Sequence, residues 1–177
     1  LRGRLRHSLT RLDIPLLVRF HRAWQANDRA SLARWSDFLG ASRETEELAA
    51  HDRSLGRALA RLLADLGVAR ATELVESPGV NYTAAFALAA DAWSIPLEAA
   101  AEGYLFGWIE SQVAAAIKLV PLGQTQGQRI LGSLMPEIPE RAAWGCGLAD
   151  EDIGFSEPGL SIASALHASQ YARLFRS

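Results

Sequence analysis

Cysteine is almost absent from this 177-residue chain: its single thiol, Cys146, excludes a disulfide within the chain and fits a reducing cytoplasm. Long hydrophobic runs are also missing. The closest approach, residues 113–120, is interrupted by Lys118, and we therefore expect no membrane span. No secretory signal is recognisable. Because the chain begins at Leu1 and not at Met, we expect its natural N-terminus to be missing.

Motifs for metal binding and catalysis are lacking too. No histidine pairs with another His, Cys or carboxylate at a standard metal spacing; the four are His7, His21, His51 and His167. The acidic stretch 150–152 lacks the alternating ligands of a calcium loop, so we expect a solvated turn. The glycines Gly123 and Gly127 are not followed by the Lys-Ser/Thr pair of a phosphate loop, and Cys146 has no evident base. We expect no enzyme, metal site or cofactor.

The net charge of −2 is unevenly distributed along the chain. Residues 1–70 carry a balance of +5 and residues 71–177 a balance of −7. An unevenly charged, solvated surface explains this, and faces that meet differently charged partners are the alternative. Arg2, Arg4 and Arg6 alone do not make the dense basic face of a nucleic-acid-binding protein, so no nucleic acid partner is expected.

Hydrophobic periodicity indicates helices throughout. Five leucines fall on one helical face after residue 50, an arginine ridge lies on another, and Gly67 suits the end of that helix. The leucines are Leu55, Leu59, Leu62, Leu63 and Leu66, and the ridge is Arg53, Arg57 and Arg61. Further stripes are Leu17, Phe20 and Trp24, and Leu32, Trp35 and Leu39. Later helices are expected over 82–93, 124–135, 139–148 and 162–174. No alternating β pattern appears, so we predict one all-α domain over 1–177.

The longest periodic segment runs from about 96 to 120 and predicts a long central helix of a bundle. Pro96 suits its first turn. We expect Leu105, Trp108 and Ile117 to be buried, and Gly103 and Gly107 to permit close helix contact.

The segment 118–131 is the most distinctive part of the chain. It opens with the only lysine, Lys118, and continues with a proline, two glycines and three glutamines. Pro121 and Gly123 should end one helix, and Gln124 or Thr125 should open the next. Lys118 is either a lysine that complements the helix C-terminus or a cation that faces a partner.

The C-terminal end keeps apolar residues where chain ends are usually polar. Leu174 and Phe175 lie between Arg173 and Arg176. These side chains either dock on their own domain or enter a partner, and composition leaves both open.

Two of these segments resemble the family of urease accessory protein F (UreF). The stretch Val-Pro-Leu-Gly-Gln-Thr-Gln-Gly-Gln-Arg at 120–129 and the ending Gln-Tyr-Ala-Arg-Leu-Phe-Arg-Ser at 170–177 are the specific matches. The segment 41–48 and the helix around Gly56 are similar to the middle of that family. The family's usual opening stretch, rich in glycine, is absent here.

The resemblance implies an all-α, non-enzymatic scaffold for nickel insertion into urease, acting on the urease apoprotein and often dimeric. Family members bridge UreD (UreH) and the GTPase UreG, and modulate GTP hydrolysis. By position, the UreG side falls on Lys118, Gln124, Gln128 and Arg129. The UreD side falls on Arg173, Leu174, Phe175 and Arg176, within the tail 170–177. The rival interpretation is a stand-alone helical ligand-binding or regulatory protein, which a large cavity would favour.

Overall fold

The computed structural model describes residues 1–120, 122–154, 159, 162, 163 and 166. Over this part of the chain every regular element is a helix, which confirms the all-α prediction. The long elements are α2 (Ile14–Gln25), α3 (Arg29–Ser42), α4 (Glu46–Asp65), α6 (Tyr82–Ala92), α7 (Leu97–Leu119), α8 (Gln124–Leu134) and α9 (Ile138–Cys146). The shorter ones are α1 (Arg2–Arg4), the π-helix η1 (Leu5–Asp13), α5 (Ala71–Glu76), η2 (Met135–Glu137) and η3 (Asp150–Asp152).

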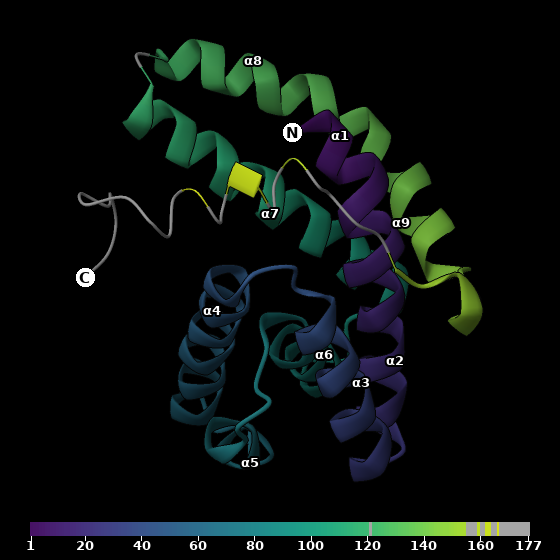
Figure 1. Cartoon of the computed structure of the whole chain (residues 1–177). Coiled ribbons are helices and arrows are strands. Elements are labelled where there is room, and N and C mark those ends of the chain that lie inside the picture. Colours follow the sequence, from purple (N-terminus) through teal and green to yellow (C-terminus); the bar gives the residue numbers. More distant parts are fainter. Residues whose placement is uncertain (121, 155–158, 160–161, 164–165, 167–177) are drawn as a thin grey trace.

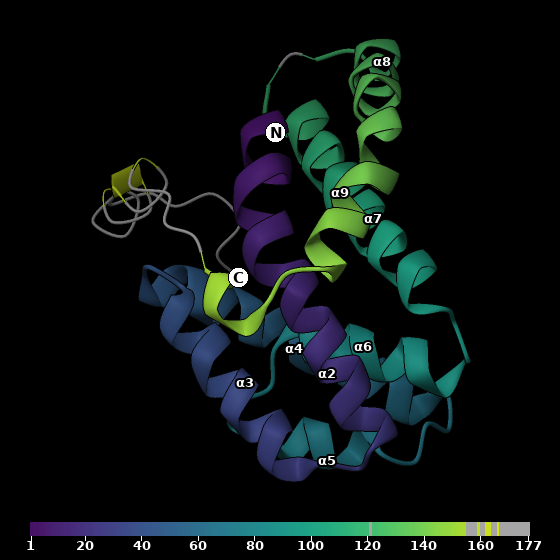
Figure 2. The same cartoon turned by 90° about the vertical axis from the view of Figure 1, so that its right-hand side faces the viewer.

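The helices form two groups that share one N-terminal rod. In Figure 1, α3, α4, α5 and α6 lie around the lower part of the rod formed by α1, η1 and α2, whereas α7, α8 and α9 lie around its upper part. The view from the side in Figure 2 gives the same division. Helices α2 and α6 make the most extensive contact, and the predicted stripe Leu17, Phe20 and Trp24 is buried there. The Trp24 indole also donates to the Ala84 carbonyl at 2.9 Å.

Helix α4 ends where Gly67 predicts its end, but only part of the leucine face is buried, namely Leu63 with Leu59 packed beside it. Thr45 caps the N-terminus through the Leu48 amide, and Gly67 follows the C-terminus with φ of +83°. The buried face consists of Ala49, Asp52, Gly56, Ala60 and Leu63. Three leucines of the predicted leucine face are exposed by 43%, 52% and 60%: Leu55, Leu62 and Leu66.

The cause of this correction is the close approach of α4 and α6. A Cβ added to Gly56 would lie 2.5 Å from the carbonyl carbon of Asn81, immediately before α6. Only small side chains fit at such a distance, so small residues occupy the contact, and Leu55, Leu62 and Leu66 lie on another side of the helix. Of the arginine ridge, Arg57 and Arg61 are exposed, whereas Arg53 is half-buried and pairs with Glu46.

Helix α7 confirms the predicted long helix to within a residue at each end. Pro96 is its N-cap residue and does not lie inside its first turn. The helix contacts α2, α6, α8, α9 and η1, and so connects the two groups. Leu105 is fully buried as predicted, whereas Trp108 and Ile117 are half-buried and pack against the core from its edge.

Glycine contacts in the upper group differ from the prediction. Gly107 of α7 has no atom within 4 Å of an added Cβ, and Gly103 has only the tip of Phe86 at 4.0 Å. The close approaches involve Gly127 of α8 and Gly145 of α9 instead; an added Cβ on Gly145 would lie 2.8 Å from Ile14. These two glycines let α8 and α9 pack tightly on α7 and on the N-terminal rod.

The later segments follow their predictions closely. Helices α8 and α9 cover most of the predicted 124–135 and 139–148. The acidic stretch at 150–152 is exposed, and Asp150 is held by Arg19 at 2.6 Å. The predicted helix 162–174 lies mostly outside the described residues, and the tail 170–177 lies wholly outside them.

Candidate functional site

The candidate site is the end of the α7–α8 hairpin, formed by Leu97–Leu119 and Gln124–Leu134. The two helices pack directly because Gly127 is buried: a Cβ there would lie 2.6 Å from Ile117 Cδ1 and 3.1 Å from Val113 Cγ1. Figure 1 shows the connection between them at the upper left, remote from α5 and the lower group. The predicted break between two helices is therefore confirmed, although Pro121 itself lies outside the described residues.

Polar and apolar side chains are exposed together at this end. We define the hairpin tip as Lys118, Leu119, Val120, Gln124, Gln128 and Arg129, all of which are exposed. Leu119 is 50% and Val120 56% exposed, although both follow a helix with a buried face. Adjacent exposed aliphatic side chains beside a cation are typical of a protein-binding surface.

The cations of the hairpin tip have no acidic partner among the described residues. Neither Lys118 nor Arg129 takes part in an ion pair there, whereas Arg19, Arg29, Arg43, Arg53 and Arg70 each do. Lys118 lies in the last turn of α7, so it also complements the helix dipole. Both interpretations of Lys118 are thus compatible with its position.

The start of α8 reinforces the positive character of the tip. Its N-cap is Gly123, which has no side chain to accept from the first amides, and its first turn contains no acidic residue. The positive end of the α8 dipole therefore lies beside the cation that ends α7. A carboxylate on a partner protein is the group that such a surface attracts.

The two glutamines singled out from the sequence do not cap their neighbours. The side chains of Gln124 and Gln128 are exposed and make no hydrogen bond to other residues in the described ranges. Their amides can donate and accept, so both capacities are available to a partner. The tail residues Arg173, Leu174, Phe175 and Arg176 lie outside the described residues, and their role stays a prediction.

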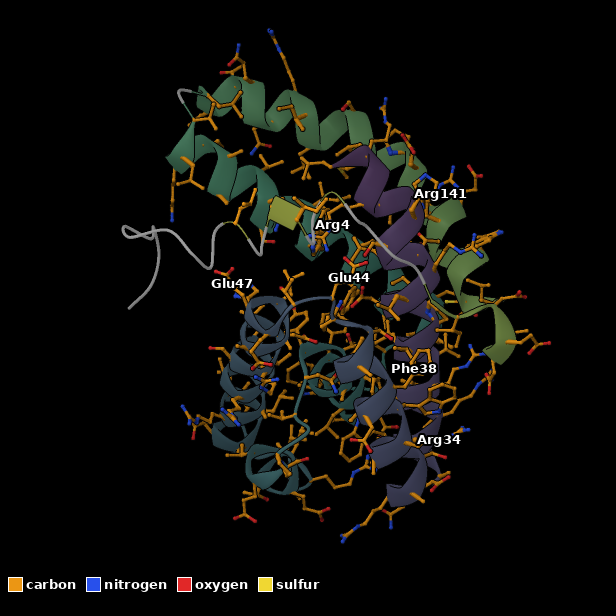
Figure 3. The ribbon with its side chains drawn as sticks, viewed as in Figure 1. Arg4, Arg34, Phe38, Glu44, Glu47 and Arg141 are labelled. Carbon is orange, nitrogen blue, oxygen red and sulfur yellow. The ribbon has the colours of Figure 1, made fainter. Side chains whose placement is uncertain are left out.

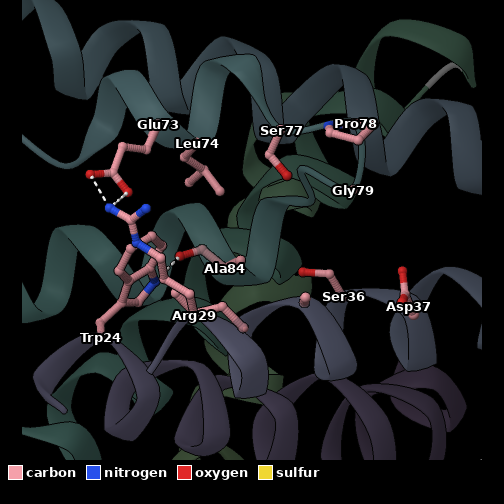
Figure 4. Close-up of a pocket in the computed structure, with 12 residues that line it drawn as sticks. Trp24, Arg29, Ser36, Asp37, Glu73, Leu74, Ser77, Pro78, Gly79 and Ala84 are labelled. Atoms are coloured by element: carbon pink, nitrogen blue, oxygen red, sulfur yellow. Dashed lines mark hydrogen bonds and ion pairs between the residues drawn. The ribbon is translucent and has the colours of Figure 1, made fainter. Parts of the chain in front are cut away.

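Three hollows open elsewhere in the described chain. The one in Figure 4 has a volume of about 350 Å³ and lies between α3 and the α5–α6 connection, with Trp24 and Leu74 in its wall. Arg29 and Glu73 pair across it at 3.0 Å. The others measure about 430 and 450 Å³. These volumes are near the lower end of the range of small-molecule sites, roughly 300–1,000 Å³.

No group of three or more His, Cys, Asp or Glu side chains that could hold a metal ion occurs within the described ranges. His7 and His51 are exposed and His21 is buried. Burial raises the pKa of the Cys146 thiol, with Glu98 adding to the effect, so this thiol is less readily ionised than a free one. In the same part of the chain, no helix combines the length and apolarity needed to cross a bilayer.

The sequence analysis missed one cluster, the buried network of Asp13, Arg43, Asp52 and Tyr104. Arg43 lies 2.7 Å from Asp13 and 3.0 Å from Asp52. One signal was available: Asp52 is in helical phase with Gly56 and the other small residues that form the buried face of α4. A charged residue in that phase indicates a buried ion pair.

Comparison with known proteins identifies the family. The UreF family profile matches residues 1–135, which is most of the chain and includes the whole α7–α8 hairpin. The chain belongs to the UreF family. A relative from Alkalilimnicola ehrlichii, named urease accessory protein UreF, is 51% identical to this chain over its whole length. The chain covers 78% of that protein.

Two more relatives with the same name extend the match. The UreF proteins of Hahella chejuensis and Chromohalobacter salexigens are each 44% identical; the chain aligns over its whole length and covers 79% and 76% of them. The resemblance stated from segments 120–129 and 170–177 is therefore confirmed at the level of the family. The family profile ends at residue 135, but the UreF relatives align with residues 136–177 as well.

Proposed function

We propose that this UreF protein is a urease accessory scaffold that supports nickel insertion into the urease apoprotein without being an enzyme itself. In this proposal it bridges UreD (UreH) and the GTPase UreG, and it modulates GTP hydrolysis by UreG. The family supports the accessory role, since its relatives are named as accessory proteins. We further propose that it acts in the cytoplasm, where a single reduced thiol is stable.

The hairpin tip supports the UreG contact in particular. Lys118 and the uncapped start of α8 form a positive surface flanked by exposed Leu119 and Val120. Such a surface can attract a carboxylate and bury aliphatic area around it. We assign Lys118 and Arg129 to charge recognition, and Gln124 and Gln128 to hydrogen bonds at the same interface.

The decisive experiment replaces Lys118 by alanine and follows UreG. The Lys118→Ala protein should keep the wild-type melting temperature, because the side chain is exposed and has no ion pair in the described chain. Its association with UreG should weaken by roughly fivefold to thirtyfold, as expected for the loss of about 1–2 kcal/mol at a charged interface. UreG-dependent GTP hydrolysis in the assembled complex is the second measurement.

A matched control is Arg61→Ala on the arginine ridge of α4. Arg61 is also an exposed helical cation without an ion pair among the described residues, but it lies on a different helix. Arg61→Ala should leave UreG binding unchanged. Equal effects of the two substitutions would show that net charge, and not the hairpin tip, governs the contact; a lower melting temperature with normal UreG binding would make Lys118 structural.

The UreD contact is assigned to the C-terminal tail. Removing the chain from Arg173 onward should abolish copurification with UreD while helicity and melting temperature stay close to wild type. Unfolding of the truncated protein would show that Leu174 and Phe175 pack on their own domain. We also propose a homodimer, which light scattering of the purified chain tests directly.

A further inference from the structure

A hollow of about 450 Å³ lies at the N-terminal end of α7, the opposite end of this helix from the hairpin tip. Helix α2 supplies one wall through His21, Arg22 and Gln25. The end of α6 and its connection to α7 supply the other wall, through Asp91 and residues 94–97. Figure 2 shows this connection at the right of the molecule. At 1.5 Å per residue, α7 separates the hollow from the hairpin tip by roughly 35 Å.

His21 is the buried polar side chain of this hollow. Its exposed fraction is 7%, yet its ring makes no hydrogen bond or ion pair with the residues that the structure describes. Its ring nitrogens are nevertheless not sealed from solvent. In the described chain, the fully buried side-chain atoms without a hydrogen bond belong to Asp13 and to arginines such as Arg141 of α9, which Figure 3 shows in the upper part of the molecule. A histidine ring carries at least one N–H in either tautomer, so His21 offers a donor to a ligand in the hollow.

The first amides of α7 add further donors at this end of the helix. The N-cap residue is Pro96, which supplies no side-chain acceptor, and the amides of residues 97–99 donate to no group within the described ranges. Unpaired amides at the positive end of a helix dipole attract an anion. The helix end does not stand alone here, because His21 and Arg22 line the same hollow.

Ser94 occupies a backbone conformation that glycine usually takes. Its φ is +54°, and the Ile95 amide donates to the Ala90 carbonyl at 2.8 Å, an arrangement that commonly ends a helix with glycine at this position. Ser94 lines the hollow, and its hydroxyl makes no hydrogen bond with the described part of the chain. The serine therefore places another donor where the backbone alone favours glycine.

The charges around the hollow cancel, so the ligand is defined by the donors and not by an excess of charge. Asp91 is engaged by Arg70, and its side chain is only 15% exposed. Arg22 is exposed and takes part in no ion pair among the described residues. Glu98, in the first turn of α7, offsets the charge of Arg22, but it is exposed and does not line the hollow. Of the charged groups in the wall, Arg22 thus stays open to a ligand.

We propose that this hollow binds the carboxylate of an acidic side chain from a partner polypeptide. A carboxylate only accepts hydrogen bonds, and its two oxygens can meet the Arg22 guanidinium and the His21 ring together. The polypeptide source follows from the apolar surface beside the hollow, where Trp93 is 54% and Ile95 37% exposed. The residues next to the acidic side chain can cover this surface, whereas an inorganic anion would leave it in water.

The first test uses the peptide acetyl-Leu-Glu-Leu-amide, with acetyl-Leu-Gln-Leu-amide as its uncharged isostere. Binding is followed by nuclear magnetic resonance through the indole signal of Trp93 and the ring signals of His21. The glutamate peptide should shift both in a saturable manner, and the glutamine peptide should bind at least about tenfold more weakly, equivalent to 1.4 kcal/mol. Inorganic phosphate should bind more weakly than the glutamate peptide and leave the Trp93 signal in place.

Substitutions in α2 locate the site. Arg22→Gln removes an exposed charge, so it should keep the wild-type melting temperature and weaken binding of the glutamate peptide by about tenfold. The matched control is Arg57→Gln on α4, an exposed helical arginine without an ion pair in the described chain, which should leave binding unchanged. His21→Phe keeps a ring in the wall but removes both nitrogens, and it should abolish binding; if it prevents folding, Arg22→Gln decides the question.

Four results would overturn the proposal. Equal binding of the two peptides would show that the carboxylate is not recognised. Undiminished binding to the Arg22→Gln protein would place the site elsewhere. Tighter binding of phosphate than of the glutamate peptide would make the ligand an inorganic anion. No saturable binding of any probe would mean that the hollow holds water only. None of these outcomes depends on UreG or UreD, so they leave the proposed scaffold function untouched.

Discussion

The α4–α6 contact and the α7–α8 contact both depend on a buried glycine, but the surroundings of the two glycines differ. Gly56 of α4 faces backbone atoms of Asn81, whereas Gly127 of α8 faces the end of the Ile117 side chain. The backbone of Asn81 cannot move without disturbing α6, whereas the end of the Ile117 side chain can rotate. A side chain at position 56 would therefore require backbone to shift, whereas one at position 127 would require only a side chain to rotate.

Exposure follows the same division. In the lower helix group Phe20 and Leu88 are completely buried, and the Asn81 and Thr83 side chains at the start of α6 are buried and hydrogen-bonded. At the hairpin tip, by contrast, aliphatic and cationic side chains remain in solvent. The two parts of the molecule thus differ in how much apolar surface they leave in water.

The largest expected effect is in the core. Leu105 of α7 is fully buried at the place where the two groups meet, so Leu105→Ala should lower the free energy of unfolding by about 2–5 kcal/mol. Leu119→Ala at the hairpin tip, half-exposed, should change it by less than about 0.5 kcal/mol. Denaturant unfolding measures both. Similar values for the two variants would remove the contrast between core and tip.

The two buried glycines give a second, smaller contrast. Gly56→Ala should cost about 1–3 kcal/mol, since its methyl group overlaps backbone. Gly127→Ala should cost less than about 1 kcal/mol, because Ile117 can rotate away and alanine favours the helix. The control is Gly132→Ala, which meets nothing within 4 Å and should raise stability by roughly 0.5–1 kcal/mol. A larger loss of stability for Gly127→Ala than for Gly56→Ala would show that the α7–α8 contact, and not the α4–α6 contact, tolerates an added methyl group less well.

A third effect, smaller than those of Leu105→Ala and Gly56→Ala, concerns the junction between the groups. The Tyr104 hydroxyl lies 2.9 Å from Thr83 Oγ1 and 3.3 Å from Asp13 Oδ1. Tyr104→Phe should therefore lower the free energy of unfolding by about 0.5–1.5 kcal/mol at pH 7. Urea unfolding followed by both circular dichroism and tryptophan fluorescence will show whether the two groups then unfold together.

The same tyrosine predicts an alkaline limit. Burial, with the charges of Asp13 and Asp52, raises the pKa of Tyr104 well above its ordinary value of 10.0, and burial also raises the pKa of Tyr82. Above pH 10 the unfolded chain loses these protons first, so the folded state binds more protons and its stability falls as pH rises. The Tyr104→Phe protein should show a shallower fall between pH 10 and 11; a slope equal to that of the wild type would exclude this tyrosine as the cause.

Sequence patterns predicted the helices well because capping and punctuation are local. The end of α4 and the break between α7 and α8 follow from Gly67 and Gly123, and the start of α7 follows from Pro96. Burial was less predictable. A leucine-rich face is the natural candidate for the core, yet the shape of the neighbouring helix selected the small residues around Gly56 instead.

The hairpin tip and the buried network also differ in how far the sequence predicted them. The hairpin tip was predictable because its residues are close in sequence and unusual in composition. The network of Asp13, Arg43 and Asp52 was less predictable: helical phase marks Asp52 as buried, but its partners come from separate elements. Only their common position in the fold makes them a group.

The exposed leucines of α4 have a consequence for the amount of free protein. Leu62 and Leu66 present apolar area that water solvates poorly, and such faces on separate molecules attract one another. Because encounters between two copies increase with the square of their concentration, we expect association through this face to grow steeply as free chain accumulates. The outer side of α4 should therefore favour production of the chain in step with whatever covers it.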